Sequence, residues 1–292
     1  MKVIILLGVL TLLHSFQTLF CTLYTSRYAG EKKLASPVFC VLQSIVIACF
    51  TLIAGEFSAG VSILTIIFGV LNAGMLFCFN TSLIKAGSLG SYAFMNMMLL
   101  FGGILVPVIY SALFVPGEAL GIWQIVAIGL MLIAFVLMNI KEIRLKGTKP
   151  MYYVFCLLLF LSNGFYGTLL KMQSVHGEAQ KDAMVVISYA LMGVIALTQL
   201  GIKEGKGTFK AFSIGKKAIL PLICSLVSSS LAIFVLTRVM NLADAATLFT
   251  VDNGGVLVLA AMYSFVIFKE KPTLTKILAM VFAVVSIFIF SI

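Results

Sequence analysis

One carboxylate, Asp252, stands in the middle of a long apolar segment, just before Asn253 and a pair of glycines. An ionisable side chain at membrane depth is costly and by default faces a cavity or a partner helix. If a helix begins near Asp244, a rise of about 1.5 Å per residue puts Asp252 roughly 12 Å deep, close to a bilayer midplane. We therefore expect Asp252 to exchange protons or contact a substrate. The alternative is an aspartate that only holds its helix to a neighbour.

The first apolar segment carries His14, Gln17 and Thr18, which share one face of a helix because they are three and four residues apart. Histidine titrates near neutral pH without help, so His14 is the second candidate for proton coupling. In the corresponding segment of the second half, Asn163 stands where His14 does and Tyr166 where Gln17 does. Matched polar clusters favour a shared cavity, although a lone buried histidine also serves as a structural hydrogen bonder.

Further polar residues lie in two later segments, where Tyr92 and Asn96 share a face and Thr247 and Thr250 precede the aspartate by about one turn. Asn72 and Asn80, and the serines near 225–230, mark two more polar segments. The segments near 120–140 and 273–292 have almost no polar residues at mid-length, so we expect them outermost. The predicted central cavity is lined by His14, Gln17, Tyr92, Asn96, Asn163, Tyr166, Thr250, Asp252 and Asn253.

The composition requires membrane-spanning helices to hold these residues. The chain has 292 residues, of which 62% are hydrophobic and 10% charged, with a mean hydropathy of +1.17. Soluble domains are about 45–50% apolar and about 25% charged, and lipid cannot satisfy an open backbone. We predict an all-α integral membrane protein with ten spans, at about 3–24, 37–54, 61–83, 89–114, 120–140, 151–171, 183–201, 214–237, 244–268 and 273–292.

The basic residues predict the orientation of these spans. Sixteen of the twenty lysines and arginines fall in the connections between spans 1–2, 3–4, 5–6, 7–8 and 9–10. The positive-inside rule places these connections in the cytoplasm and both termini outside. The charges are therefore a topology signal on scattered short loops, and we expect no nucleic-acid partner.

The two halves of the chain resemble one another at a constant offset of 152 residues. Gly102-Gly103 and Glu118 of the first half match Gly254-Gly255 and Glu270 of the second. Five spans per half is an odd number, so the second half enters the membrane from the opposite side. We predict two inverted five-helix repeats, 1–145 and 146–292, in one bundle.

Other residues have structural interpretations beside functional ones. Lys85 and Arg238 end two spans, where they either attract an anion or extend to the headgroups. Glu118 and Glu270 precede helices whose starts favour a carboxylate, and the glycine pairs either interrupt a helix or allow close packing. Pro107 and Pro221 predict kinks within two spans. The last span places Ala279, Ala283 and Ser286 on one face, a weak signal for a homodimer.

The six cysteines all lie in apolar spans and form no C-x-x-C pair, so we expect neither disulfides nor a metal site. We also expect no other cofactor. No H-E-x-x-H or G-x-S-x-G motif is present, which argues against an intramembrane lipid-modifying enzyme.

Ten spans in two inverted halves, each half carrying Gly-Gly and a later glutamate, resemble the EamA-like ten-helix branch of the drug/metabolite transporter superfamily. The best match runs from Asn253 through Phe268-Lys269-Glu270-Lys271-Pro272. The resemblance implies a carrier of a small polar metabolite, such as an amino acid, commonly exported, and driven by protons or by facilitated diffusion.

We expect the chain to work by alternating access in a prokaryotic inner membrane, with a small-molecule solute, the lipid bilayer and protons as its partners. The sequence leaves two alternatives open, a flippase for a lipid-linked substrate and a receptor-like scaffold in the same fold.

Overall fold

The computed structural model describes residues 2–28, 32–58, 60–90, 92–139, 150–205, 211–266 and 273–290. These residues form ten α-helices and one 3-10 turn (η1), with no strand among them. The prediction of an all-α fold is therefore confirmed, with one helix for each predicted span. The helices are α1 (Lys2–Arg27), α2 (Lys32–Ala54), α3 (Ile63–Leu89), α4 (Tyr92–Phe114), α5 (Ile122–Asn139), α6 (Pro150–His176), η1 (Glu178–Gln180), α7 (Lys181–Glu204), α8 (Lys216–Val239), α9 (Ala245–Val266) and α10 (Leu274–Phe290).

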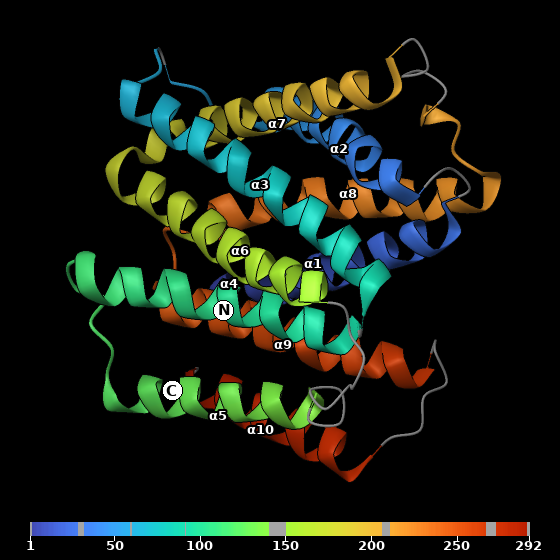
Figure 1. Ribbon diagram of the computed structural model, residues 1–292. Helices are drawn as coiled ribbons and strands as arrows, with labels where there is room; N and C mark the ends of the chain where they lie inside the picture. Colours follow the sequence, from blue (N-terminus) through green and yellow to red (C-terminus); the bar gives the residue numbers. More distant parts are fainter. Residues whose placement is uncertain are drawn as a thin grey trace.

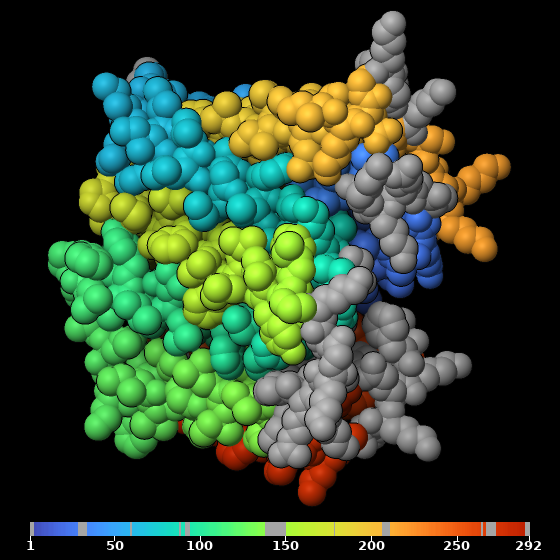
Figure 2. All heavy atoms as spheres, in the orientation of Figure 1, coloured from blue at the N-terminus to red at the C-terminus, as the bar shows by residue number. Residues whose placement is uncertain are grey.

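Eight of these helices, α1–α4 and α6–α9, are long and apolar enough to cross a membrane, and α5 and α10 are shorter apolar helices. The outer surface carries large apolar side chains, among them Ile63 of α3, Trp123 of α5 and Leu157 of α6, all of them exposed. Figure 2 shows parts of these three helices on one face of the molecule. An apolar outer surface of this extent suits lipid better than water, which indicates a multi-pass membrane protein.

The helices lie side by side in one bundle, and their ends gather at two opposite sides of it (Figure 1). Helices of the first half pack mainly on helices of the second: α1 on α8 and α9, α2 on α7, α3 on α6 and α7, and α4 on α6 and α9. α5 and α10 pack on each other at one edge of the bundle. The predicted boundary at residue 145 lies outside the described residues.

Glycine allows several of these helices to approach closely. A Cβ on Gly102 of α4 would overlap the carbonyl oxygen of Phe160 in α6 and lie 2.7 Å from its carbonyl carbon. A Cβ on Gly255 of α9 would lie 2.5 Å from the Thr11 methyl group of α1. α9 runs unbroken through Gly254 and Gly255, so these glycines serve packing and do not interrupt the helix.

The small-residue face of α10 is also used inside the chain. Ala279, Ala283 and Ser286 are fully buried, and the Ser286 hydroxyl donates to the Ala127 carbonyl oxygen of α5 at 2.7 Å. Within the chain this face is therefore covered by α5, and the homodimer expected from it stays a prediction.

Two ion pairs lie at the end of the bundle where α1 begins. The Arg238 guanidinium of α8 donates to both carboxylate oxygens of Asp182 in α7, at 3.0 and 2.8 Å. Asp182 also accepts from the Glu56 backbone N–H at 2.7 Å. Arg238 lies over the ring of Phe234, 4.5 Å from its centroid. Arg238 is thus a bidentate structural partner of Asp182. The Lys85 ammonium of α3 lies 5.1 Å from the ring centroid of Phe155.

The second ion pair joins Glu118, in the connection between α4 and α5, to Lys171 of α6 at 2.5 Å. Glu118 also accepts a hydrogen bond from the Ser111 hydroxyl and one from the Ala245 backbone N–H, at 2.9 Å, where α9 begins. Burial alone would raise the pKa of Glu118, but these donors outweigh it and hold the pKa below its ordinary value. The glutamate therefore serves the start of α9 and not that of α5. Its predicted counterpart, Glu270, lies outside the described residues.

Candidate functional site

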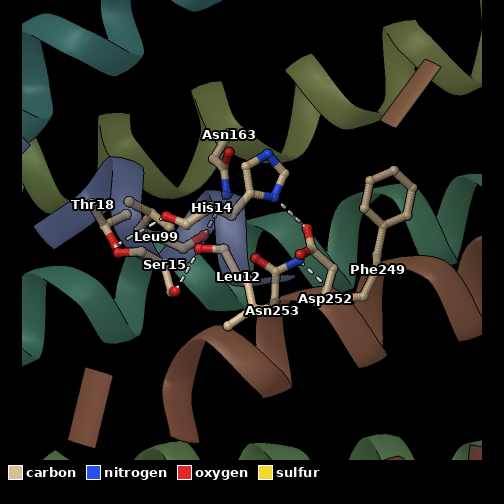
Figure 3. Close-up of polar contacts among 9 residues, drawn as sticks. All are labelled: Leu12, His14, Ser15, Thr18, Leu99, Asn163, Phe249, Asp252 and Asn253. Atoms are coloured by element: carbon tan, nitrogen blue, oxygen red, sulfur yellow. Dashed lines mark hydrogen bonds and ion pairs between the residues drawn. The ribbon is translucent and has the colours of Figure 1, made fainter. Parts of the chain in front are cut away.

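At mid-length of the bundle, His14 of α1 and Asp252 of α9 form an ion pair. The His14 Nδ1 atom lies 2.7 Å from the Asp252 Oδ2 atom, with 24% of the histidine side chain exposed and 6% of the aspartate. Figure 3 shows the two side chains pointing toward one another from their separate helices. The two residues that the sequence singled out for proton coupling are thus direct partners, although 238 positions separate them in the chain.

The second carboxylate oxygen of Asp252 is unpartnered. Oδ1 is buried and accepts no hydrogen bond from the described residues. A buried acceptor without a donor costs about 1–3 kcal/mol, and more when it is charged. Of the six buried side-chain atoms without a partner in the described part of the chain, Asp252 Oδ1 is the one that belongs to a carboxylate.

The pair lies in the wall of a cavity of about 100 Å³, which is formed by helices of both halves. Six of the nine predicted cavity residues line it: His14, Gln17, Asn163, Tyr166, Asp252 and Asn253. Two others do not, since Thr250 is fully buried away from the cavity and Asn96 is not among the lining residues. The side chain of the ninth, Tyr92, is outside the described part of the structure.

Five further polar residues line the cavity, namely Thr18 of α1, Gln43 of α2, Asn80 of α3, Tyr189 of α7 and Ser229 of α8. The Asn80 amide donates to the Gln43 carbonyl oxygen at 2.9 Å, and the Gln43 amide donates to the Ser229 hydroxyl at 3.3 Å. The sequence indicated the polar segments of Asn80 and Ser229. It missed Gln43 and Tyr189, because neither stands out among the few polar residues of its own span and only the packing of the helices decides that both face the cavity.

Two asparagines hold their amide groups beside Gly103 of α4. The Asn163 amide nitrogen donates to the Leu99 carbonyl oxygen at 2.9 Å, and the Asn253 amide nitrogen donates to the Phe249 carbonyl oxygen at 2.8 Å (Figure 3). A Cβ on Gly103 would lie 2.6 Å from the first amide and 2.9 Å from the second. Glycine is therefore required here so that amides from α6 and α9 can meet at one point on α4.

A separate depression of about 400 Å³ lies at the end of the bundle where α1 begins. Its polar lining includes the Glu118–Lys171 pair, and the hydroxyl of Ser174 donates to the Asn241 side-chain oxygen at 2.5 Å. These side chains are already partnered. We therefore place the chemistry at the central cavity.

Among the described residues, no group of three or more histidine, cysteine or acidic side chains is arranged to hold a metal ion. The six cysteines carry free thiols. The titratable side chains of the central cavity are His14, Asp252, Tyr166 and Tyr189. The arrangement suits hydrogen bonding and proton exchange with a small solute.

Comparisons with known proteins bear on the fold alone. No protein-family model matches the chain, and no curated protein matches it. Solved structures do match, and one of them, described only as "Crystal structure of protein", superposes with a TM-score of 0.70. The match covers 97% of this chain and 98% of that one at 15% sequence identity. The ten-helix arrangement is thus shared along the whole length of another protein.

Proposed function

We propose that the chain is a secondary transporter that moves a small polar metabolite across the cytoplasmic membrane by alternating access. We place it in the EamA-like branch of the drug/metabolite transporter superfamily, which its sequence resembles. The observation that carries the proposal is the His14–Asp252 pair, held at mid-depth in a bundle of apolar helices and facing a polar-lined cavity. Ionisable groups in such a place mark substrate or ion pathways.

The helix contacts support two inverted repeats. Exchanging each helix with the one five places later turns the α1–α8 contact into α6–α3, α4–α6 into α9–α1, and α3–α7 into α8–α2. All six of these contacts are present, and α2–α7, α4–α9 and α5–α10 map onto themselves. The pattern is that of two equivalent halves, and the odd number of helices in each makes them antiparallel. Inverted halves around a midplane site are the architecture of many secondary transporters.

The charge distribution supports the orientation that we propose. In the sequence the basic residues concentrate in alternate connections, which by the positive-inside rule lie in the cytoplasm and put both termini outside. The end that carries the Asp182–Arg238 and Glu118–Lys171 pairs is then the outer one.

Proton coupling follows from the chemistry of the pair. An imidazole and a carboxylate 2.7 Å apart share a proton in the hydrogen bond between them. Loss of this proton, or gain of a further one, changes the net charge of the cavity by one. A solute that binds one charge state better than the other exchanges with protons, because differential affinity is what shifts a two-state equilibrium. The two halves then rock about the cavity and expose it to either side.

Transport by reconstituted protein tests the proposal. Wild-type protein in proteoliposomes is expected to drive uptake of a solute from a metabolite panel when a pH gradient is imposed. Asp252→Asn should abolish the response to the gradient, because an amide exchanges no proton. Asp244→Asn is the matched control, since it makes the same change at the start of the same helix, where asparagine caps as well as aspartate.

Two results would contradict the proposal. Unchanged gradient-driven uptake by the Asp252→Asn protein would remove the coupling role, and absence of uptake for every solute by the wild type would remove the transport function. Movement of a labelled lipid between leaflets would instead identify the flippase.

A further inference from the structure

The depression at the outer end of the bundle lies along the same helices as the central cavity. α6 contributes Gly167 to the cavity and Lys171 to the depression. In the same way, α8 contributes Leu236 to the cavity, and its C-terminal cap, Met240, lines the depression. The residues of each pair are four positions apart, which is about 6 Å along a helix. The outer depression is therefore about one helical turn beyond the cavity.

An apolar barrier separates the two hollows. Leu236 and Phe249 line the central cavity, Met240 lines the outer depression, and all three belong to one buried apolar cluster, each at most 5% exposed. The ring of Phe249 reaches α6, since a Cβ on Gly167 would lie 3.1 Å from one of its atoms. The two hollows share no lining residue. In this conformation the central cavity is thus closed toward the outer depression.

One carboxylate holds the helices of this barrier from the other half of the chain. Glu118 belongs to the first half, whereas its partners, the Lys171 ammonium of α6 and the Ala245 backbone N–H of α9, belong to the second. Lys171 is one turn from Gly167, and Ala245 is one turn from Phe249. Glu118 therefore fixes the two helices whose contact includes the Phe249 ring.

The other ion pair at this end is placed differently. Asp182 and Arg238 lie on α7 and α8, so both belong to the second half. Neither residue lines the cavity or the depression. If the two halves move apart at the outer end, the Glu118–Lys171 pair must break, while the Asp182–Arg238 pair can remain.

We propose that Glu118 and Lys171 form an outer gate, and that separation of this pair lets the halves part and joins the outer depression to the central cavity. The Glu118 side chain is 16% exposed, so water can replace its partners as the gate opens. Rigid-body movement of one half against the other is a common way to open such a path. The inference rests on the proposed function, because outward opening is one step of alternating access.

The reactivity of a cysteine in the central cavity tests the gate. Ser229→Cys places a thiol of nearly the same size as the native hydroxyl in the cavity wall. A charged, membrane-impermeant methanethiosulfonate is added to right-side-out or inverted membrane vesicles. Mass spectrometry then follows modification of residue 229 separately from the six native thiols. Leu242→Cys, in the outer depression and 49% exposed in the native chain, reports which vesicles present the outer end.

Matched variants separate the gate from general stability. Glu118→Ala removes every contact of the carboxylate, and we expect it to speed modification of Ser229→Cys from the outer end at least about tenfold, which corresponds to about 1.4 kcal/mol. Lys171→Gln should act in the same direction, and Lys171→Arg, which keeps the charge, should react as the parent does. Arg238→Gln is the control, because it removes a cation from the pair that lies within one half, and it should leave the rate unchanged. Size-exclusion chromatography first confirms a single species for each variant.

The inference is overturned if Glu118→Ala and Lys171→Gln leave the rate unchanged, or if Arg238→Gln raises it as much as they do. Faster modification only from the face opposite to that of Leu242→Cys would also overturn it. The reaction needs no solute, so its outcome is independent of the transport assay. Faster modification in a protein that transports no solute would retain the gate and remove the carrier function, whereas transport with unchanged modification would do the reverse.

Discussion

Replacing Gly102 by alanine tests the packing that holds the two halves together at the cavity. The added Cβ would overlap the Phe160 carbonyl oxygen and lie 2.7 and 2.8 Å from the Phe160 carbonyl carbon and Cα. Carbon atoms pack at about 3.5–4.0 Å. α4 and α6 must therefore separate by about 1 Å, because backbone atoms cannot swing away as a flexible side chain can.

The expected cost follows from two opposing effects. Glycine to alanine within a helix gains up to about 1 kcal/mol from propensity alone. Overpacking against a rigid neighbour costs about 1–3 kcal/mol or more, and the separation also lengthens the 2.9 Å bond from Asn163 to the Leu99 carbonyl oxygen, which crosses the same interface. We expect a net loss of about 1–3 kcal/mol, which at this chain length lowers the unfolding temperature by about 2–5 °C.

Gly129→Ala is the control for this change. Gly129 lies mid-length in α5, and a Cβ there would meet nothing within 4 Å, so the variant should unfold at or slightly above the wild-type temperature. Thermal unfolding of both variants in detergent, by differential scanning fluorimetry, makes the comparison. An unfolding temperature for Gly102→Ala equal to or above that of Gly129→Ala would refute the role assigned to this glycine.

Three further predictions concern the polar contacts outside the cavity. Asp182→Asn should destabilise the protein by about 1–3 kcal/mol, which is less than the loss of a fully buried ion pair would cost, because Arg238 is one-quarter exposed. Adding Arg238→Gln to this variant should cost little more. If the two losses add fully in thermal unfolding, the pairing is contradicted. Because the pKa of Glu118 is lowered in the folded state, the contribution of this carboxylate to stability is complete above its ordinary pKa and disappears as the pH falls below that value. The unfolding temperature should therefore drop over this acidic range, and Glu118→Gln should make the drop smaller. Ser286→Ala should cost about 1 kcal/mol by removing the bond from α10 to α5, and an unchanged unfolding temperature would show that the bond contributes nothing.

The sequence predicts most of the fold because hydrophobic runs in lipid have few alternatives to helices. Each of the ten spans corresponds to a helix, and His14 and Asp252 could be selected because an ionisable residue in such a run is rare. Their contact could not be predicted, since it depends on how α1 crosses α9, and no local pattern specifies that crossing. The same limit explains Gln43 and the face of α10. Each looked unremarkable or exposed on its own helix, and each acquires its role only from the neighbouring helix that covers it.

The choice of partner distinguishes the cavity carboxylate from the two at the bundle end. Asp182 is held by the guanidinium of Arg238 and Glu118 by the ammonium of Lys171. Asp252 is held by an imidazole, which is the one cationic side chain whose charge is lost near neutral pH. A lysine or arginine at position 14 would fix the charge of the cavity and satisfy the carboxylate permanently. The histidine leaves both open to change, and this is why we place the proposed proton coupling at the His14–Asp252 pair, while the end pairs are suited to holding helices together.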